Sequence, residues 1–204
     1  MGATRNTSVR YPGGRRAVWG ALGFVFSYLL CLPIAILGGP RLFNTVTVSI
    51  QGETLPLTDF VAPGGIADWV LAGGLFFNAQ FVPLSIPIEY NSRVVAVWVN
   101  LVLENGGVFL AALVIPAVVY AVTGAVATRD TETSNATRRA KRAVFQFTGC
   151  FPLAIVSLYL FSFPVSEMSG GPVLLWGLVV GGFLYPAVFG AVGGWIATKR
   201  GNDR

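Results

Sequence analysis

The sequence predicts an all-α membrane protein with four transmembrane helices, arranged as two parallel-repeat hairpins. A small extracytoplasmic α+β insert is expected between the first and second helices. The chain of 204 residues is 54% hydrophobic and only 11% charged, whereas soluble domains carry about 25% charged residues. Four apolar runs are each long enough to cross about 30 Å of hydrocarbon. In addition, Pro116–Arg129 matches Pro186–Lys199 without a gap at 8 of 14 positions, which indicates two hairpins of similar construction.

The four apolar runs divide the chain into tails, spans and connections. The first run, 17–37, holds no charge over 21 residues; because a signal-peptide core is normally 7–15 residues long, we interpret it as a retained helix. The expected spans are 17–37, 107–128, 143–163 and 173–198. The cytoplasmic parts are the tails 1–16 and 199–204 and the basic loop 129–142. The insert 38–106 and the outer loop 164–172 lie on the other side.

The insert carries strand signals and one helical signal. Hydrophobic and polar residues alternate over 45–50, and a Gln-Gly-Glu turn allows 54–57 to return as a partner strand. A second β-like run covers 94–103. Between them, the run 66–82 has near-helical aromatic spacing and is too short to span. It predicts a helix that either lies in the membrane interface or packs on the mouth of the bundle, with aromatic side chains at headgroup level. The residues of this interfacial segment are Trp69, Phe76, Phe77, Asn78, Gln80 and Phe81.

The charges predict the orientation. With four spans both termini lie on one side, and 12 of the 14 basic residues lie there too, which gives a net charge of about +9 on that side and −4 on the other. The positive-inside rule therefore places both termini in the cytoplasm of a multi-pass cell-membrane protein. Nucleic-acid binding is not expected. The middle loop is a candidate contact for anionic lipid through four residues: Arg138, Arg139, Lys141 and Arg142.

The repeated segments suggest two roles for their special residues. Pro116 and Pro186 lie at matched depth, so they are either a pair of hinges lining a path or prolines tolerated inside membrane helices. Small residues at four-residue spacing allow close helix approach, to a helix of this chain or of a second copy. On the fourth span these are Gly177, Gly181, Gly182, Gly190 and Gly194.

The residue types restrict the chemistry. The chain has no histidine, which excludes imidazole general bases and the commonest metal ligand. Cys31 and Cys150 lie at different depths and are expected to be free thiols. The spans hold no Asp, Glu, Lys or Arg, the residues that mark proton and ion paths, and their isolated polar side chains are expected to bond helix to helix. No cofactor, metal or catalytic residue is predicted.

The block Trp69–Val82, WVLAGGLFFNAQFV, resembles an uncharacterised family of haloarchaeal four-span integral membrane proteins. The likeness covers this block and the general layout of the spans. Because such a family has no established activity, the resemblance implies a membrane location and little else.

Two functions remain open. The first is a non-enzymatic envelope or interaction protein whose outer insert contacts a partner or the membrane surface. The alternative is a small transporter or channel subunit that oligomerises through its glycine-rich fourth helix. Asn78 and Gln80 discriminate between them: side chains pointing into a cavity between the helices favour transport, and side chains that satisfy backbone groups disfavour it.

Overall fold

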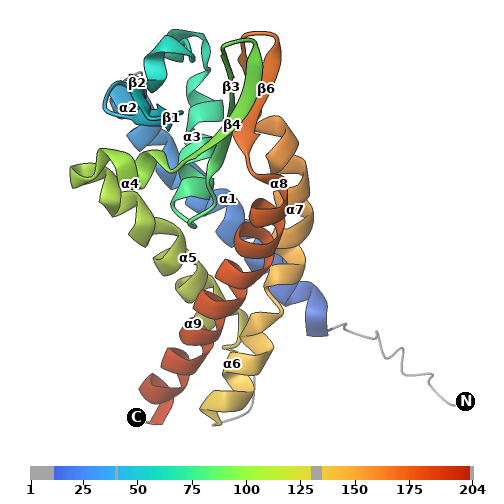
Figure 1. Cartoon of the computed structure of the whole chain (residues 1–204). Helices are drawn as coiled ribbons and strands as arrows, with labels where there is room; N and C mark the ends of the chain where they lie inside the picture. Colours follow the sequence, from blue (N-terminus) through green and yellow to red (C-terminus); the bar gives the residue numbers. More distant parts are fainter. Residues whose placement is uncertain (1–11, 40, 130–134, 203–204) are drawn as a thin grey trace, which may run out of the picture.

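The computed structural model describes residues 12–39, 41–129 and 135–202. Four helices are long and apolar enough to cross a membrane, so the prediction of an integral membrane protein with four spans is confirmed. In Figure 1 they run between a β-containing domain at one end and the C-terminus at the other. The spans consist of α1 (Pro12–Gly38); η3 (Gly107–Leu110) with α5 (Ala111–Ala127); α6 (Ala136–Val144) with α7 (Phe147–Leu160); and α8 (Leu174–Trp176), η4 (Gly177–Leu184) and α9 (Tyr185–Asn202).

The third span begins earlier than predicted, because the second half of the expected basic loop is helical. Asn135 starts α6 by accepting a hydrogen bond from the Arg138 N–H at 3.2 Å, and Ala, Arg and Lys are good helix formers. The first span likewise begins before 17. The tail segments 1–11 and 203–204 and the loop segment 130–134 lie outside the described residues.

The first part of the insert follows the prediction. After the short α2 (Arg41–Asn44), β1 (Thr47–Ile50) pairs antiparallel with β2 (Glu53–Pro56). Gln51 and Gly52 both have positive φ, as a two-residue turn of the type favoured in hairpins requires. Two 3-10 turns, η1 (Leu57–Asp59) and η2 (Pro63–Gly65), then lead to α3 (Asp68–Asn78).

A four-stranded antiparallel sheet, in the order β4-β3-β6-β5, completes the domain. Neither β3 nor the strand pair of the supposed outer loop 164–172 is expected from the sequence. Pro87 argues against a central strand, but β6 pairs with β3 only at Leu84 and Ser85, so Pro87 has a single neighbouring strand. The strands are β3 (Leu84–Tyr90), β4 (Arg93–Val99), β5 (Phe163–Val165) and β6 (Met168–Pro172).

The second β-like run ends earlier than predicted. The Asn100 side chain accepts hydrogen bonds from the N–H groups of Val102 and Leu103 at 3.1 and 3.2 Å, and this cap starts α4 (Leu101–Asn105). At the other end of the sheet, the Tyr90 hydroxyl donates to the Glu53 carboxylate. This bond links the two sheets and raises the pKa of Tyr90 above its ordinary value.

Helix α3 is buried inside the protein, which agrees with the predicted packing on the bundle and not with the other predicted place, the membrane interface. Its residues from Val70 to Asn78 are all buried, and the helix packs on α1. Gly73 permits this, because a Cβ there would lie 2.0 Å from the Phe161 ring. A helix that is apolar on every side has no polar face to turn toward water, and such a helix is normally buried.

Glycines bring the spans into backbone contact. A Cβ on Gly193 of α9 would lie 1.8 Å from the Ala121 carbonyl oxygen of α5, and one on Gly149 of α7 would lie 1.8 Å from the Ala17 carbonyl oxygen of α1. The helices that carry the repeated segments, α5 and α9, therefore lie directly against each other. In a bilayer this packing replaces the hydrophobic effect between helices, because lipid tails are equally apolar.

Replacing Gly193 with Val is expected to lower the free energy of unfolding in detergent by about 2–3 kcal/mol, because the side chain meets backbone that cannot move aside. The measurement is thermal or denaturant unfolding of the purified full chain. Gly64→Val is the matched control, since a Cβ there meets nothing within 4 Å. Equal loss in both variants would contradict the packing described.

Candidate functional site

A buried polar cluster joins three of the four spans near their crossing. The fully buried Gln146, between α6 and α7, donates from Nε2 to the Pro186 carbonyl at 2.6 Å and to the Tyr120 carbonyl at 3.3 Å. Its Oε1 accepts from the Thr123 hydroxyl at 3.3 Å. Both amide hydrogens and the amide oxygen are therefore used, and one side chain connects α5, the third span and α9.

The fourth span, α1, reaches the same cluster through small residues. A Cβ on Gly20 would lie 1.9 Å from the Gln146 carbonyl oxygen, so the backbone of α1 contacts the junction between α6 and α7. The Cys150 thiol, one turn further, donates to the Gly20 carbonyl at 3.2 Å. Gly190 is needed as well, because its Cβ would lie 2.2 Å from Gln146 Nε2 and would block the bond to Pro186.

The cluster has the chemistry of a structural connection. It contains amide, hydroxyl, thiol and carbonyl groups and no ionisable acid or base that titrates near neutral pH. The buried hydroxyls of Ser27 and Tyr120 have no hydrogen-bond partner within the described residues, although Tyr120 points toward Cys150. Within the described residues, no three or more Asp, Glu, Cys or His side chains lie close enough together to hold a metal ion.

Asn78 and Gln80 both form hydrogen bonds with backbone groups. The Asn78 side chain donates to the Val82 carbonyl and accepts from the Leu101 N–H, both at 2.8 Å. Gln80 donates to the Phe76 carbonyl at 3.3 Å, while its Oε1 has no partner in the described structure. These bonds close the turn after α3 and fix it to the start of α4.

The predicted aromatic surface is divided between core and exterior. Phe76 and Phe77 are fully buried and pack edge-on against Phe24 of α1, so these two residues are not available to a partner or to headgroups. Trp69 and Phe81 remain 47% and 54% exposed. The prediction that Phe76 and Phe77 lie at headgroup level was wrong, because their helical spacing reflects burial against α1.

The glycines and prolines of the fourth span pack within the same chain. A Cβ on Gly177, Gly181 or Gly182 would approach Leu158, Phe77 or Ala154 to within 3.0 Å, and Gly194 lies against Ala143 and Arg139 of α6. Helices α3, α6 and α7 thus cover the glycine row, so these glycines are not exposed to a second copy of the chain.

Pro116 and Pro186 lie in different backbone settings. Pro116 is inside the α-helix α5, whereas Pro186 follows the π-helical segment η4 (Gly177–Leu184). A π-helix widens the helix just before a residue that lacks an N–H. The matched pair of hinges therefore stays a prediction.

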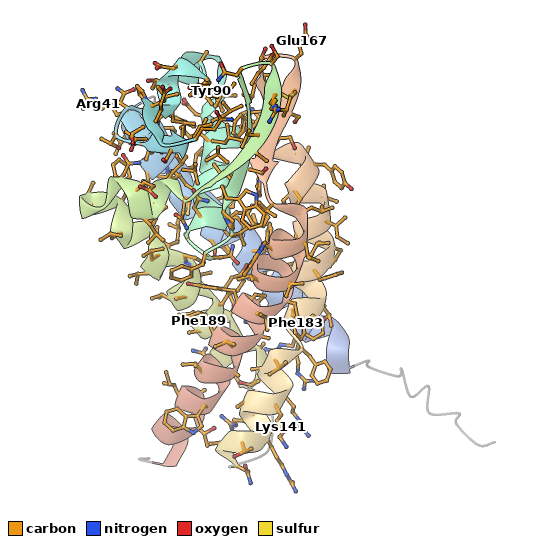
Figure 2. All side chains as sticks on the ribbon, viewed as in Figure 1. Arg41, Tyr90, Lys141, Glu167, Phe183 and Phe189 are labelled. Carbon is orange, nitrogen blue, oxygen red and sulfur yellow. The ribbon has the colours of Figure 1, made fainter. Side chains whose placement is uncertain are left out.

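The four basic candidates lie on α6, at the end of the molecule opposite the β-containing domain. Figure 2 shows Lys141 at this end and Arg41, Tyr90 and Glu167 at the other. Arg138, Lys141 and Arg142 are exposed and Arg139 is half-buried. This segregation agrees with the charge pattern of the sequence, and the contact with anionic lipid stays a prediction.

Sequence reasoning missed the most exposed apolar surface of the domain, the strand β4. This strand is at the edge of the sheet, and Val94 and Trp98 on one of its faces are 61% and 59% exposed. Beside it, a hollow of about 430 Å³ is lined by Trp98, Tyr159 and Leu174 among others. The sequence signal for this surface was the absence of charge at residues 94–99, within the predicted β-like run 94–103. That pattern predicts a strand but does not show whether another element covers it.

A comparison with protein-family models decides the classification. The chain belongs to DUF7978, a family of unknown function, whose model matches residues 2–201. No curated protein and no solved structure matches the chain. Membership in DUF7978 therefore covers the spans and the β-containing domain together, and an archaeal origin stays a prediction.

In this DUF7978 member, Gln146→Leu is expected to lower the free energy of unfolding by about 2 kcal/mol, at about 0.6 kcal/mol for each of three lost membrane hydrogen bonds. Thr148→Val is the control, because Thr148 is exposed and bonds only to the Phe145 carbonyl of its own turn. Unfolding of both variants is compared in the same detergent. An unchanged stability of Gln146→Leu would show that the cluster does not hold the spans together.

Proposed function

We propose that this chain is a non-enzymatic interaction protein of the cell membrane. Its four spans anchor the β-containing domain outside the cytoplasm, and the free edge of β4 receives an extended segment of another envelope polypeptide. The observation that carries the proposal is the unpaired, apolar edge of β4. The amide of Gln146 and the hydroxyl of Thr123 are occupied by contacts that hold the spans together, which supports an anchor more than a catalyst or a carrier.

The edge of β4 lacks the usual protection against strand addition. Natural edge strands carry inward-pointing charges, lysines, prolines or bulges. Here β4 pairs with β3 in unbroken register over seven residues, with one charge at its start, Arg93. A partner strand gains main-chain hydrogen bonds along this edge, and the side chains of Val94 and Trp98 add apolar contacts at alternate positions.

A different polypeptide fits this edge better than a second copy of the chain. In Figure 1 β4 slopes from the outer tip of the domain toward the spans. Two copies in one membrane with the same orientation are related by an axis along the spans, which reverses only the component of β4 that lies in the membrane plane. Because β4 slopes, it would cross its symmetry mate at a large angle and could not pair with it along its length, whereas a segment of another chain can align fully with the edge.

The alternative, a transporter or channel subunit joined through the fourth span, has less support. Its proposed contact surface is filled by α3, α6 and α7 of the same chain. The side chains of Asn78, Thr123 and Gln146 bond to backbone groups or to one another.

The proposal requires the orientation indicated by the charges, with α6 in the cytoplasm and the domain outside. Cys31 and Cys150 are both fully buried, so introduced cysteines are labelled without background. In intact cells, Gly64→Cys is expected to react with a membrane-impermeant maleimide and Lys141→Cys only after the membrane is opened. The reverse pattern would place the domain in the cytoplasm and overturn the proposal.

Strand addition at β4 is tested by a photocrosslinking amino acid at Trp98 in intact cells. We expect a discrete adduct with one other polypeptide, and Val94→Lys in the same chain is expected to lower its yield about tenfold, the effect of losing one well-packed interface residue. The same amino acid at the exposed Thr54 of β2 is the control position.

Three results would contradict strand addition by a partner. They are the absence of an adduct at position 98, equal adducts at positions 54 and 98, and an adduct with twice the mass of this chain, which would assign the edge to a second copy. An adduct that persists undiminished in Val94→Lys would show crosslinking without a specific site.

A further inference from the structure

A groove follows α1 and α5 along the lipid-facing side of the bundle. It consists of two hollows of about 470 and 620 Å³ that share Ala111 as a common wall residue. Because α1 and α5 run in opposite directions, Leu30 lies level with the middle of α5, and Leu37 lies level with its start. The walls are almost entirely apolar, and their main side chains are those of Leu30, Ile34, Leu37, Val108, Ala111, Val114 and Val118.

The groove has one polar end, at the junction with the outer domain. Arg41, Thr45 and Asn105 line it there. The Thr45 hydroxyl donates to Asn105 Oδ1 at 2.7 Å, and the Asn105 amide donates to the Leu42 and Leu101 carbonyls at 2.8 Å each. Since these hydrogen bonds fix Thr45 and Asn105 to α2 and α4, the shape of the polar end is set before anything binds.

Arg41 is the only charged side chain that lines this end, and it is exposed. Within the described residues no carboxylate forms an ion pair with it, including Glu104, which precedes Asn105 in the chain. It is also one of only two basic residues on the domain's side of the spans, the other being Arg93 on the sheet. A cation is thus placed at the mouth of an apolar groove, with its charge free for a ligand.

We propose that this groove binds a membrane lipid with an anionic phosphate headgroup. Its walls belong to two membrane spans, so the molecules that reach them are lipids, and an acyl chain matches a long apolar groove with no hydrogen-bonding groups. The headgroup then lies at the end where the spans meet the domain, where the guanidinium of Arg41 pairs with a phosphate oxygen. Charge complementarity selects an anionic lipid over a zwitterionic one.

The test uses the purified full chain in a mild detergent, with an equimolar mixture of phosphatidylglycerol and phosphatidylcholine of the same acyl chains. Native mass spectrometry measures the ratio of the two bound lipids. We expect phosphatidylglycerol to predominate and Arg41→Gln to lower the ratio about fivefold, the effect of one basic residue near a lipid surface. Arg93→Gln is the matched control and is expected to leave the ratio unchanged.

A second pair of variants tests the groove itself. Ala111→Trp fills the wall that both hollows share and is expected to reduce retention of both lipids. Val122→Trp, at an exposed position on the same helix outside the groove, is expected to have no effect. Equal ratios in Arg41→Gln and Arg93→Gln would overturn the headgroup site. Undiminished lipid retention in Ala111→Trp would overturn the acyl-chain site.

Discussion

Gln146 reaches the carbonyl oxygen of Pro186 only because residue 190 has no side chain, and the arrangement of the spans depends on approaches of this kind. Inside a bilayer there is no water to satisfy a polar group, and apolar side chains gain little by leaving lipid for one another. Helices are then held by direct backbone contact and by a few shared hydrogen bonds. Gly20, Gly149 and Gly193 supply the contact, and Gln146 supplies the bonds.

The β-containing domain also joins the spans, at one end of the bundle. Its four-stranded sheet combines β3 and β4, from the connection between the first and second spans, with β5 and β6, from the connection between the third and fourth. The Val173 N–H continues this contact by donating to the Pro83 carbonyl at 3.0 Å. The two hairpins are therefore joined by a sheet at the end that carries the β-containing domain and by Gln146 deeper in the bundle, with α3 packed between these two contacts.

The sequence was sufficient for the parts of the fold that depend on local pattern. Run length and hydropathy predicted the four spans, and alternation with a Gln-Gly turn predicted β1 and β2. It was insufficient where contacts with a segment far away in the sequence determine the local structure. β3 contains Pro87 and forms a strand because Arg93–Val99 and two residues of β6 pair with it. The aromatic spacing of α3 was visible, but whether Phe76 faces headgroups or Phe24 depends on packing that no local pattern records.

The candidate site was predictable to a similar degree. Gln146, Thr123 and Ser27 are conspicuous as polar residues in apolar runs, and the expectation that such residues bond helix to helix holds for the first two. Their meeting point was not predictable, because it requires the close approach of α9 at Gly190. The exposed edge of β4 was not predictable either, because an uncharged strand is typical of a protein core. Only the strand order of the sheet shows that β4 has a neighbouring strand on one side.

The two surfaces assigned here, the edge of β4 and the groove beside α1, are connected through α4. β4 leads directly into this five-residue helix, whose first turn is capped by Asn100. Its last residue, Asn105, holds Thr45 and Leu42 beside Arg41. Asn100 also donates to the Asn78 carbonyl at 3.0 Å, which ties α4 to the turn that follows α3. A strand added to β4 and a lipid held at Arg41, as proposed above, would therefore contact the same short helix at its opposite ends.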